Sequence, residues 1–164
     1  MKMKNAKKIN KILKLIVSLI LCQLPGLIGS FFTLQAIPNW YAYLNKPILN
    51  PPNWLFAPVW TLIYLSLGIS FFLIWQSNQS QIKKKMAYYV FFVQLILNAF
   101  WSIFFFGLRS PLLALIEIIF LWIIIAWNIK LFYQLHRLAG LILIPYLLWV
   151  TFATYLTFSI FLLN

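Results

Sequence analysis

Five long apolar runs constrain the fold of this chain more than any other feature of its sequence. Each is about 20 residues or longer, the length of helix that crosses a hydrocarbon core of roughly 30 Å. Of the 164 residues, 64% are hydrophobic and only 9% are charged, more apolar surface than one soluble core could bury. The sequence therefore predicts an all-α membrane protein with spans at about Ile12 to Ala36, Trp54 to Trp75, Met86 to Gly107, Pro111 to Tyr133 and Leu138 to Leu163.

The connections between these runs are short, and none has room for a soluble domain. They cover about residues 37–53, 76–85, 108–110 and 134–137. Short connections place consecutive helices side by side and antiparallel. We expect residues 1–164 to form one domain, with five transmembrane helices in an up-and-down bundle.

The net charge of +12 would suit a nucleic-acid partner, but the basic residues lie at the ends of the apolar runs. The connections expected on the opposite side of the membrane, residues 37–53 and 108–110, carry only Lys46 and Arg109. By the positive-inside rule, the N-terminus is expected in the cytoplasm, with the C-terminus and residues 37–53 outside. We therefore expect no nucleic-acid partner. The topology rests on Lys2, Lys4, Lys7, Lys8, Lys11 and Lys14, on Lys83 to Lys85, and on Lys130, His136 and Arg137.

The first run is interpreted as a span rather than a signal peptide. It is longer than a signal core of roughly 7 to 15 residues, and no clean small-x-small cleavage site follows it. Leu21 is too bulky to precede a lipoprotein cysteine at Cys22, and a single cysteine forms no intramolecular disulfide. The simplest location is a bacterial inner membrane, with an outer-membrane or organellar site as the alternative.

The connection after the first run is rich in proline. Pro47, Pro51 and Pro52 favour a stiff extended path, because proline fixes φ and removes a backbone donor. Pro58 falls in the first turns of the next run, where proline is tolerated. Such a connection is expected to hold a defined shape.

Polar and aromatic side chains recur at helical spacing within three of the runs. One face of the third run carries polar groups that are expected to point inward and either bond neighbouring helices or line a pocket. The second and fifth runs carry aromatic stripes that could form a flat apolar slot, whereas Trp40, Trp54 and Trp75 suit the membrane interface. The stripes are Gln94, Asn98, Trp101, Ser102 and Phe105; Phe56, Trp60, Tyr64 and Gly68; and Pro145, Trp149, Ala153 and Thr157.

Three sequence motifs together resemble one known family. The first is W-Y-x-x-L-x-K-P-x-x-x-P-P-x-W-x-F-x-P-V-W-T-x-x-Y, from Trp40 to Tyr64. The second is L-N-x-x-W-S-x-x-F-F-G from Leu97, and the third is P-Y-L-x-W-V-x-F-A-x-x-L from Pro145. This order of motifs is similar to the TspO/translocator protein family, also called tryptophan-rich sensory proteins, over residues 26–164.

The resemblance implies a membrane protein, commonly a homodimer, that binds tetrapyrroles such as protoporphyrin IX or haem, and in some members sterols. No resident cofactor is required. In some bacterial members the tryptophans that match Trp60 and Trp149 are implicated in light-dependent porphyrin breakdown. Carried over by position, the residues expected in the pocket are Trp60, Asn98, Trp101, Trp149 and Ala153, with Tyr41, Lys46 and Pro47 in a lid.

The chain departs from the family pattern at two positions. Leu49 replaces a tryptophan that could stack in the lid, and Thr157 replaces an asparagine that could bond another helix. The sterol signature is weak, because Leu131-x-Tyr133-x-x-x-Arg137 fits only a loose pattern and does not lie at the end of the last run.

The sequence contains few of the residues from which a conventional active site is built. The chain has no aspartate, and its acid, base and thiol side chains, Glu117, His136 and Cys22, lie on different segments. Glu117 is expected to make a structural hydrogen bond, with a proton or ligand role as the alternative. His136 is expected at the surface, with haem ligation as the alternative. A metal site built from protein ligands alone is not expected.

Three functions follow from this reading. The first is a membrane binding protein whose aromatic pocket holds a porphyrin for sensing, sequestration or transport, with Lys46 and Arg109 available to its propionates. The second is light- and oxygen-dependent degradation of that porphyrin through Trp60 or Trp149. The third is a regulatory protein that binds a sterol or another lipid, or else a structural or partner-regulating membrane protein with no small ligand, since aromatic bundles can also pack solid.

Overall fold

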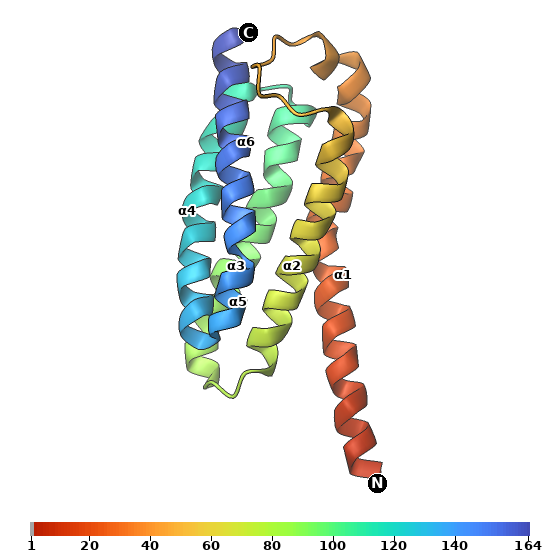
Figure 1. The fold of residues 1–164 in the computed structure, drawn as a ribbon, viewed down its shortest axis with the longest axis vertical. Coiled ribbons are helices and arrows are strands. Elements are labelled where there is room, and N and C mark those ends of the chain that lie inside the picture. The colour runs from red at the N-terminus through yellow and green to blue at the C-terminus, as the bar shows by residue number, and fades with distance from the viewer. Residues whose placement is uncertain (1) are drawn as a thin grey trace.

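The fold consists of five membrane-length helical segments, as the apolar runs predict (Figure 1). The computed structural model describes the backbone of residues 2–164 and the side chains of residues 9–164. Within that part of the chain every regular element is helical. The α-helices are α1 Lys2–Asn39, α2 Phe56–Gln76, α3 Gln81–Ser102, α4 Pro111–Leu135, α5 Arg137–Ile142 and α6 Ile144–Leu163.

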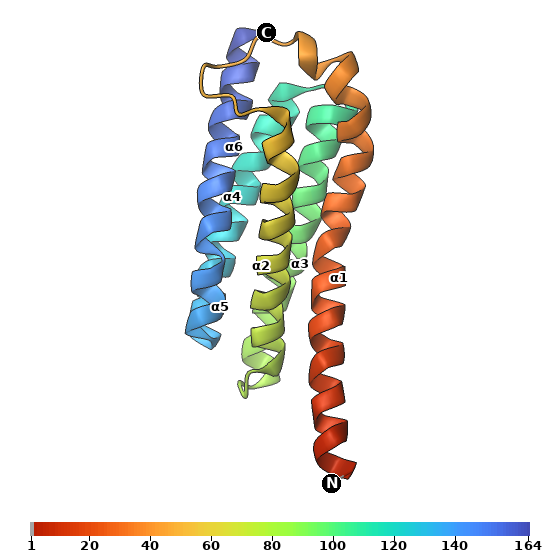
Figure 2. The same ribbon diagram turned by 45° about the vertical axis from the view of Figure 1, so that its right-hand side comes forward.

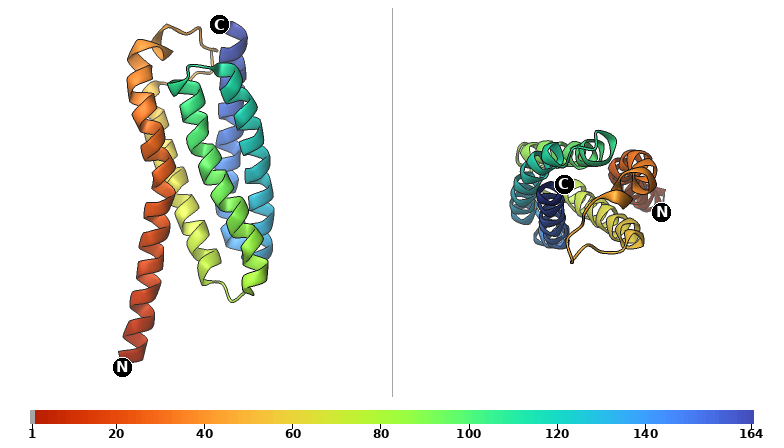
Figure 3. Two further views of the ribbon diagram at one scale, coloured as in Figure 1. Left: turned by 180° about the vertical axis from the view of Figure 1, so that it is seen from behind. Right: turned by 90° about the horizontal axis from the view of Figure 1, so that it is seen from above.

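The helices form a ring around a common core, in the order α1, α2, α5 with α6, α4 and α3 (Figure 3). α1 packs on α2 and α3, and α4 packs on α3, α5 and α6. α2 completes the ring through α5, and Ser70 Oγ there donates to the carbonyl oxygen of Ala139 at 2.7 Å. The predicted up-and-down bundle is confirmed.

The two ends of the bundle differ in charge. One end carries the N-terminus and the α2–α3 and α4–α5 connections (Figure 2), and we call it the basic end because Lys83 to Lys85 and Arg137 lie there. The other carries the C-terminus, the α3–α4 connection and the proline-rich segment 40–55, and we call it the loop end. At the basic end α1 extends well past the other helices.

Helix starts are encoded locally by side chains that accept backbone N–H bonds. Ser80 Oγ accepts from Lys83 N at the start of α3, and Ser110 Oγ accepts from Leu113 N at the start of α4, each at 3.4 Å. Pro111 occupies the first turn of α4, where its missing N–H costs no helical bond. These caps explain why α3 and α4 begin where the apolar pattern alone leaves the boundary open.

The fifth span is not one continuous helix. It divides into α5 and α6 at Leu143, two residues before Pro145. Because proline lacks an N–H and its ring clashes with the carbonyl one turn earlier, Pro145 lies in the first turn of α6. The fifth span is therefore interrupted close to the basic end.

The third span ends in a segment of wider helix that the apolar pattern does not predict. Residues Ile103–Gly107, labelled η3, form a π-helical turn, in which Leu108 N donates to the carbonyl oxygen of Ile103 at 2.7 Å. Such turns rotate the side chains that follow them and occur often at functional sites. Here the turn carries Phe105 and Phe106.

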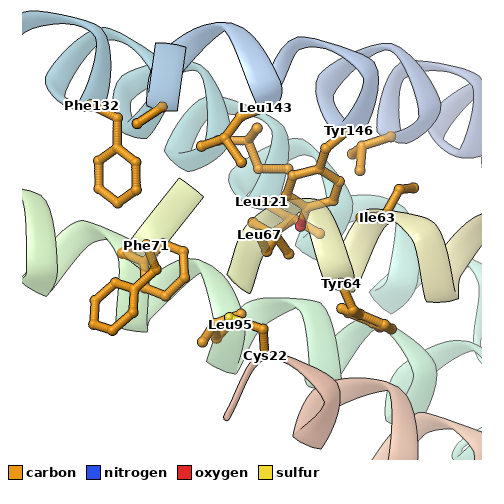
Figure 4. Close-up of a cluster of buried hydrophobic side chains, with 14 of the residues drawn as sticks. Cys22, Ile63, Tyr64, Leu67, Phe71, Leu95, Leu121, Phe132, Leu143 and Tyr146 are labelled. Atoms are coloured by element: carbon orange, nitrogen blue, oxygen red, sulfur yellow. The ribbon is translucent and has the colours of Figure 1, made fainter. Parts of the chain in front are cut away.

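The core is aromatic toward the basic end (Figure 4). Phe71 of α2 stacks on Phe91 of α3 with ring centres 4.7 Å apart, and Phe91 stacks on Phe132 of α4 at 5.5 Å. α1 closes onto this core at Gly68 of α2, where an added Cβ would lie 2.9 Å from the Cα of Leu19. The core of this half of the bundle is thus closely packed.

Candidate functional site

A cavity of about 430 Å³ lies between the helices in the loop half of the bundle. Its walls come from α1, α2, α3, α4 and α6, and Tyr41 of the short helix η1 (Tyr41–Tyr43) contributes from the proline-rich segment. Its size falls within the range of about 300 to 1,000 Å³ that is usual for small-molecule sites.

The cavity exists because α2 and α6 separate toward the loop end. α2 packs on α5 near the basic end but makes little contact with α6. Small or medium side chains of α6 face the resulting space, including Val150, Ala153 and Thr157. The break at Leu143 separates α5, which contacts α2, from α6, which lines the cavity.

Aromatic rings form two walls of the cavity. On α2, Trp60 stacks on Tyr64 with ring centres 5.6 Å apart, and Phe56 lines the space one turn earlier. On α3 and its π-helical turn, Trp101 stacks on Phe105 at 5.2 Å. These rings offer flat apolar surfaces that suit a planar ligand.

A buried hydrogen-bond chain crosses the cavity floor from α2 to α6. The Tyr64 hydroxyl donates to Asn98 Oδ1 at 2.6 Å, and Asn98 Nδ2 donates to the Tyr146 hydroxyl at 3.0 Å. Asn98 lines the cavity as well, so it serves both roles that the sequence left open. Tyr146, which is fully buried, has no role in the sequence prediction, although it lies on the same helical stripe as Val150 and Ala153.

We expect Asn98→Leu to destabilise the protein by about 2 to 3 kcal/mol, because it leaves two buried phenol groups without their partner. Tyr64→Phe removes only one of the two bonds, and we expect it to cost about 1 kcal/mol. Unfolding in mixed detergent micelles measures both. Equal stabilities of Asn98→Leu and the wild type would show that the chain of bonds does not hold α2, α3 and α6 together.

The proline-rich segment is ordered by its own contacts around Tyr41. The Tyr41 hydroxyl donates to Asn50 Oδ1 at 2.8 Å, and burial raises the pKa of this phenol, although the bond to Asn50 opposes the shift. The Lys46 ammonium lies 4.9 Å from the centre of the Tyr41 ring and donates to the carbonyl oxygens of Ala42 and Leu44. The predicted stiffness thus comes from a folded loop as well as from its prolines.

The same segment is attached to the end of α6. Asn45 N donates to Asn164 Oδ1 at 2.9 Å, and Asn164 Nδ2 donates back to the carbonyl oxygen of Asn45 at 3.1 Å. Asn45 Nδ2 also donates to the carbonyl oxygen of Leu163. These bonds hold the segment across the loop end of the bundle.

The structure brings most of the predicted site residues together. Those that line the cavity are Tyr41, Trp60, Asn98, Trp101 and Ala153. The wall also includes Phe105 and Phe106, which lie on the π-helical turn, and residues of α1 that are absent from the predicted site, such as Gln23 and Thr33. A signal for them exists in the first span, where polar and small residues recur at spacings of three and four, at Gln23, Gly26, Ser30 and Thr33.

Three predicted site residues lie outside the cavity wall. Trp149 contacts Phe56 with ring centres 6.2 Å apart and lies at the edge of the buried stripe of α6. Lys46 reaches the cavity only through Tyr41, and Pro47 does not line it. Arg109, a second candidate for a propionate, is exposed in the α3–α4 turn with φ of 52°. The ligand roles of these residues stay predictions.

Most of the remaining buried polar side chains form hydrogen bonds within the protein. Asn128 Nδ2 donates to Gln94 Oε1 at 3.1 Å and joins α4 to α3, as predicted for Gln94. Thr157 Oγ1 bonds the Ala153 carbonyl of its own helix, so it does not replace a bond between helices. The hydrogen bond predicted for Glu117 is absent: this carboxyl group is 94% buried in α4, and neither oxygen has a partner among the described residues.

The cavity reaches the lipid-facing surface between α1 and α2. Leu27, Ser30 and Leu34 of α1 line the cavity and are exposed on the outside of the bundle, as are Ala57 and Thr61 of α2. The small-residue pair Gly26-x-x-x-Ser30 therefore belongs to this margin, and an added Cβ at Gly26 would meet the Tyr64 ring of the same chain.

Comparison with known proteins agrees with the motifs and the fold. Residues 18–163 match the model of the TspO/MBR family. The chain is 46% identical to the tryptophan-rich protein TspO of Archaeoglobus fulgidus, over 93% of this chain and 98% of that protein. It is 36% identical to the tryptophan-rich sensory protein of Cereibacter sphaeroides over 77% of each chain, and 33% identical to the human translocator protein over 81% of this chain and 79% of that one. With a family match across nearly the whole sequence on five membrane-length helices, the chain belongs to the TspO/MBR family.

Proposed function

We propose that the protein binds a tetrapyrrole, protoporphyrin IX or haem, in the cavity and acts in its sensing, sequestration or transport. The observation that carries the proposal is the cavity of about 430 Å³ whose two aromatic walls belong to different helices. Each ring that stacks on a porphyrin face contributes about 0.5 to 1.5 kcal/mol beyond burial. Because Trp60 and Trp101 each stack on another aromatic ring, both are already held in place before a ligand enters.

The ligand enters from the bilayer in this proposal. The margin of the cavity between α1 and α2 consists of exposed residues that contact acyl chains, and porphyrins partition into membranes because they are largely apolar. The folded loop, attached through Asn45 to Asn164, covers the loop end of the site. An acidic edge of the ligand would face that end, where Lys46 and Arg109 are found.

We expect Lys46→Met to weaken the binding of protoporphyrin IX by about three- to tenfold, because the diacid loses a nearby cation. A dark titration followed by the absorbance of the porphyrin measures this affinity. The dimethyl ester of the same porphyrin has no charge to lose and is expected to bind the variant and the wild type equally. Equal losses for diacid and ester would assign the effect to the loop itself. Absence of saturable binding by the wild type would refute the proposed function.

A second candidate function is light- and oxygen-dependent breakdown of the bound porphyrin. It is favoured by the position of Trp60, whose ring lines the cavity and stacks on Tyr64, the first member of the buried chain through Asn98 to Tyr146. Such aromatic side chains can be oxidised by an excited ligand. An absorbing product that forms only with light and oxygen, and is lost in Trp60→Phe, would distinguish degradation from binding.

We further propose that the basic end faces the cytoplasm and that the protein resides in a bacterial inner membrane, as a homodimer. The orientation rests on the segregation of lysine and arginine, because Lys83 to Lys85 and Arg137 share the end at which α1 begins. Exposed apolar faces of the helices, which otherwise contact lipid, would form the interface of the proposed dimer.

A further inference from the structure

A second hollow lies at the basic end, far from the porphyrin cavity. It has a volume of about 290 Å³ and is lined by Asn10, Lys11 and Lys14 of α1 and by Trp75 and Gln76 at the end of α2. We call it the basic groove. It forms where α1 runs past the end of α2 toward the N-terminus (Figure 2).

The polar groups of the basic groove are cations and amides. The Lys14 ammonium lies 5.4 Å from the centre of the Trp75 ring, which holds the cation in the groove by a cation–π contact. Gln76 Nε2 is buried and has no hydrogen-bond partner among the described residues. A ligand oxygen could satisfy this donor once the amide turns toward the groove. The groove therefore offers several donors to an anion.

No protein carboxylate neutralises these cations. The sequence has a single acidic residue, Glu117, which lies within the span formed by α4. Nearby Lys84 differs from the groove lysines, because its ammonium donates to the carbonyl oxygens of Trp75 and Ser77 and caps the end of α2. Lys84 is thus structural, whereas the charges of Lys11 and Lys14 must be balanced from outside the chain.

We propose that the basic groove binds the phosphate headgroup of an anionic phospholipid. The oxygens of one phosphate group can together accept hydrogen bonds from both lysines and from the amides. The groove adjoins the apolar surface of α1, where Ile12, Leu13 and Ile16 are about half exposed, so the acyl chains can continue along the same helix. This continuity favours a lipid over free phosphate.

The test is lipid binding by the purified full-length protein in neutral detergent, followed by native mass spectrometry. Phosphatidylglycerol, phosphatidylcholine and inorganic phosphate are compared at equal concentration. We expect phosphatidylglycerol to bind about tenfold more tightly than phosphatidylcholine, and phosphate alone to leave no retained adduct. Equal retention of the two lipids, or phosphate binding as tight as that of the anionic lipid, would overturn the proposal.

Two double variants separate the groove from the general positive charge of this end. Lys11→Gln with Lys14→Gln removes the groove cations, and Lys83→Gln with Lys85→Gln removes two exposed cations of the same end. We expect the first double variant to weaken the binding of phosphatidylglycerol by roughly thirtyfold and the second to weaken it by less than about threefold. Equal losses of affinity in the two double variants would show that lipid binding depends only on net charge, and would overturn the proposed site.

Discussion

Ala153→Trp is expected to abolish saturable porphyrin binding, with a loss of affinity of about a hundredfold or more. Ala153 faces the cavity from α6 and is 7% exposed, so an indole at this position must occupy space that the ligand needs. A hundredfold loss corresponds to about 2.7 kcal/mol of binding free energy. The absorbance of protoporphyrin IX, titrated in the dark, measures the effect without reference to tryptophan fluorescence.

Leu148→Trp is the matched control for this change. Leu148 lies on the same helix, is 66% exposed and does not line the cavity, so its replacement adds the same side chain on the lipid-facing surface. We expect its affinity to stay within about twofold of the wild type. Wild-type binding by Ala153→Trp, in a protein that keeps its helical circular dichroism, would place the ligand outside the cavity.

Gly140→Ala is expected to destabilise the protein by about 2 to 4 kcal/mol, more than other single methyl additions in the bundle. A Cβ at Gly140 would lie 2.6 Å from the Cβ of Tyr133 and 2.7 Å from its Cα and N. These atoms belong to Tyr133 at the end of α4, two of them to its backbone, and they cannot rotate away as the end of a side chain can. Because Ser70 of α2 donates a hydrogen bond to the Ala139 carbonyl of α5, the strain in α5 would also disturb the packing of α2 in the ring of helices. Unfolding in mixed micelles provides the measurement.

Gly107→Ala provides the comparison for this prediction. The nearest atom to an added Cβ at Gly107 is Cδ1 of Phe32, at 2.9 Å, which belongs to a side chain that can shift. We expect this variant to lose less than about 1 kcal/mol. If Gly140→Ala were as stable as Gly107→Ala, the close approach of α5 to α4 would not be a constraint on the fold.

The spans could be predicted from the sequence because the bilayer leaves the backbone few choices. A chain in hydrocarbon must satisfy its N–H and C=O groups internally, so an apolar run of sufficient length becomes a helix. The same reasoning could not locate the break at Leu143 or the π-helical turn at Ile103–Gly107. The break depends on Pro145, which the length and hydropathy of an apolar run do not register, and the π-helical turn lies within apolar sequence that gives no sign of it.

The site was predictable where its residues follow a helical period. Trp60 and Tyr64 share a stripe on α2, and Asn98 and Trp101 share one on α3, and the structure places all four in the cavity wall. Gly68 continues the first stripe but meets α1 instead.

The period was less informative on α6. Its buried stripe runs through Tyr146, Val150 and Ala153, so Trp149 lies beside the stripe and contacts Phe56. Tyr146 could not be recognised as the partner of Asn98, because the pairing joins residues 48 positions apart and depends on how α3 and α6 face each other.

The most direct test of a tetrapyrrole site in the cavity compares Trp60→Phe with Trp149→Phe in a dark titration with protoporphyrin IX. Trp60 lines the cavity and Trp149 does not, although both are deep tryptophans of the bundle. We expect saturable binding by the wild type, a loss of affinity of about tenfold in Trp60→Phe and little change in Trp149→Phe. Linear binding that neither substitution alters would contradict this expectation, because the porphyrin would then only partition into the micelle.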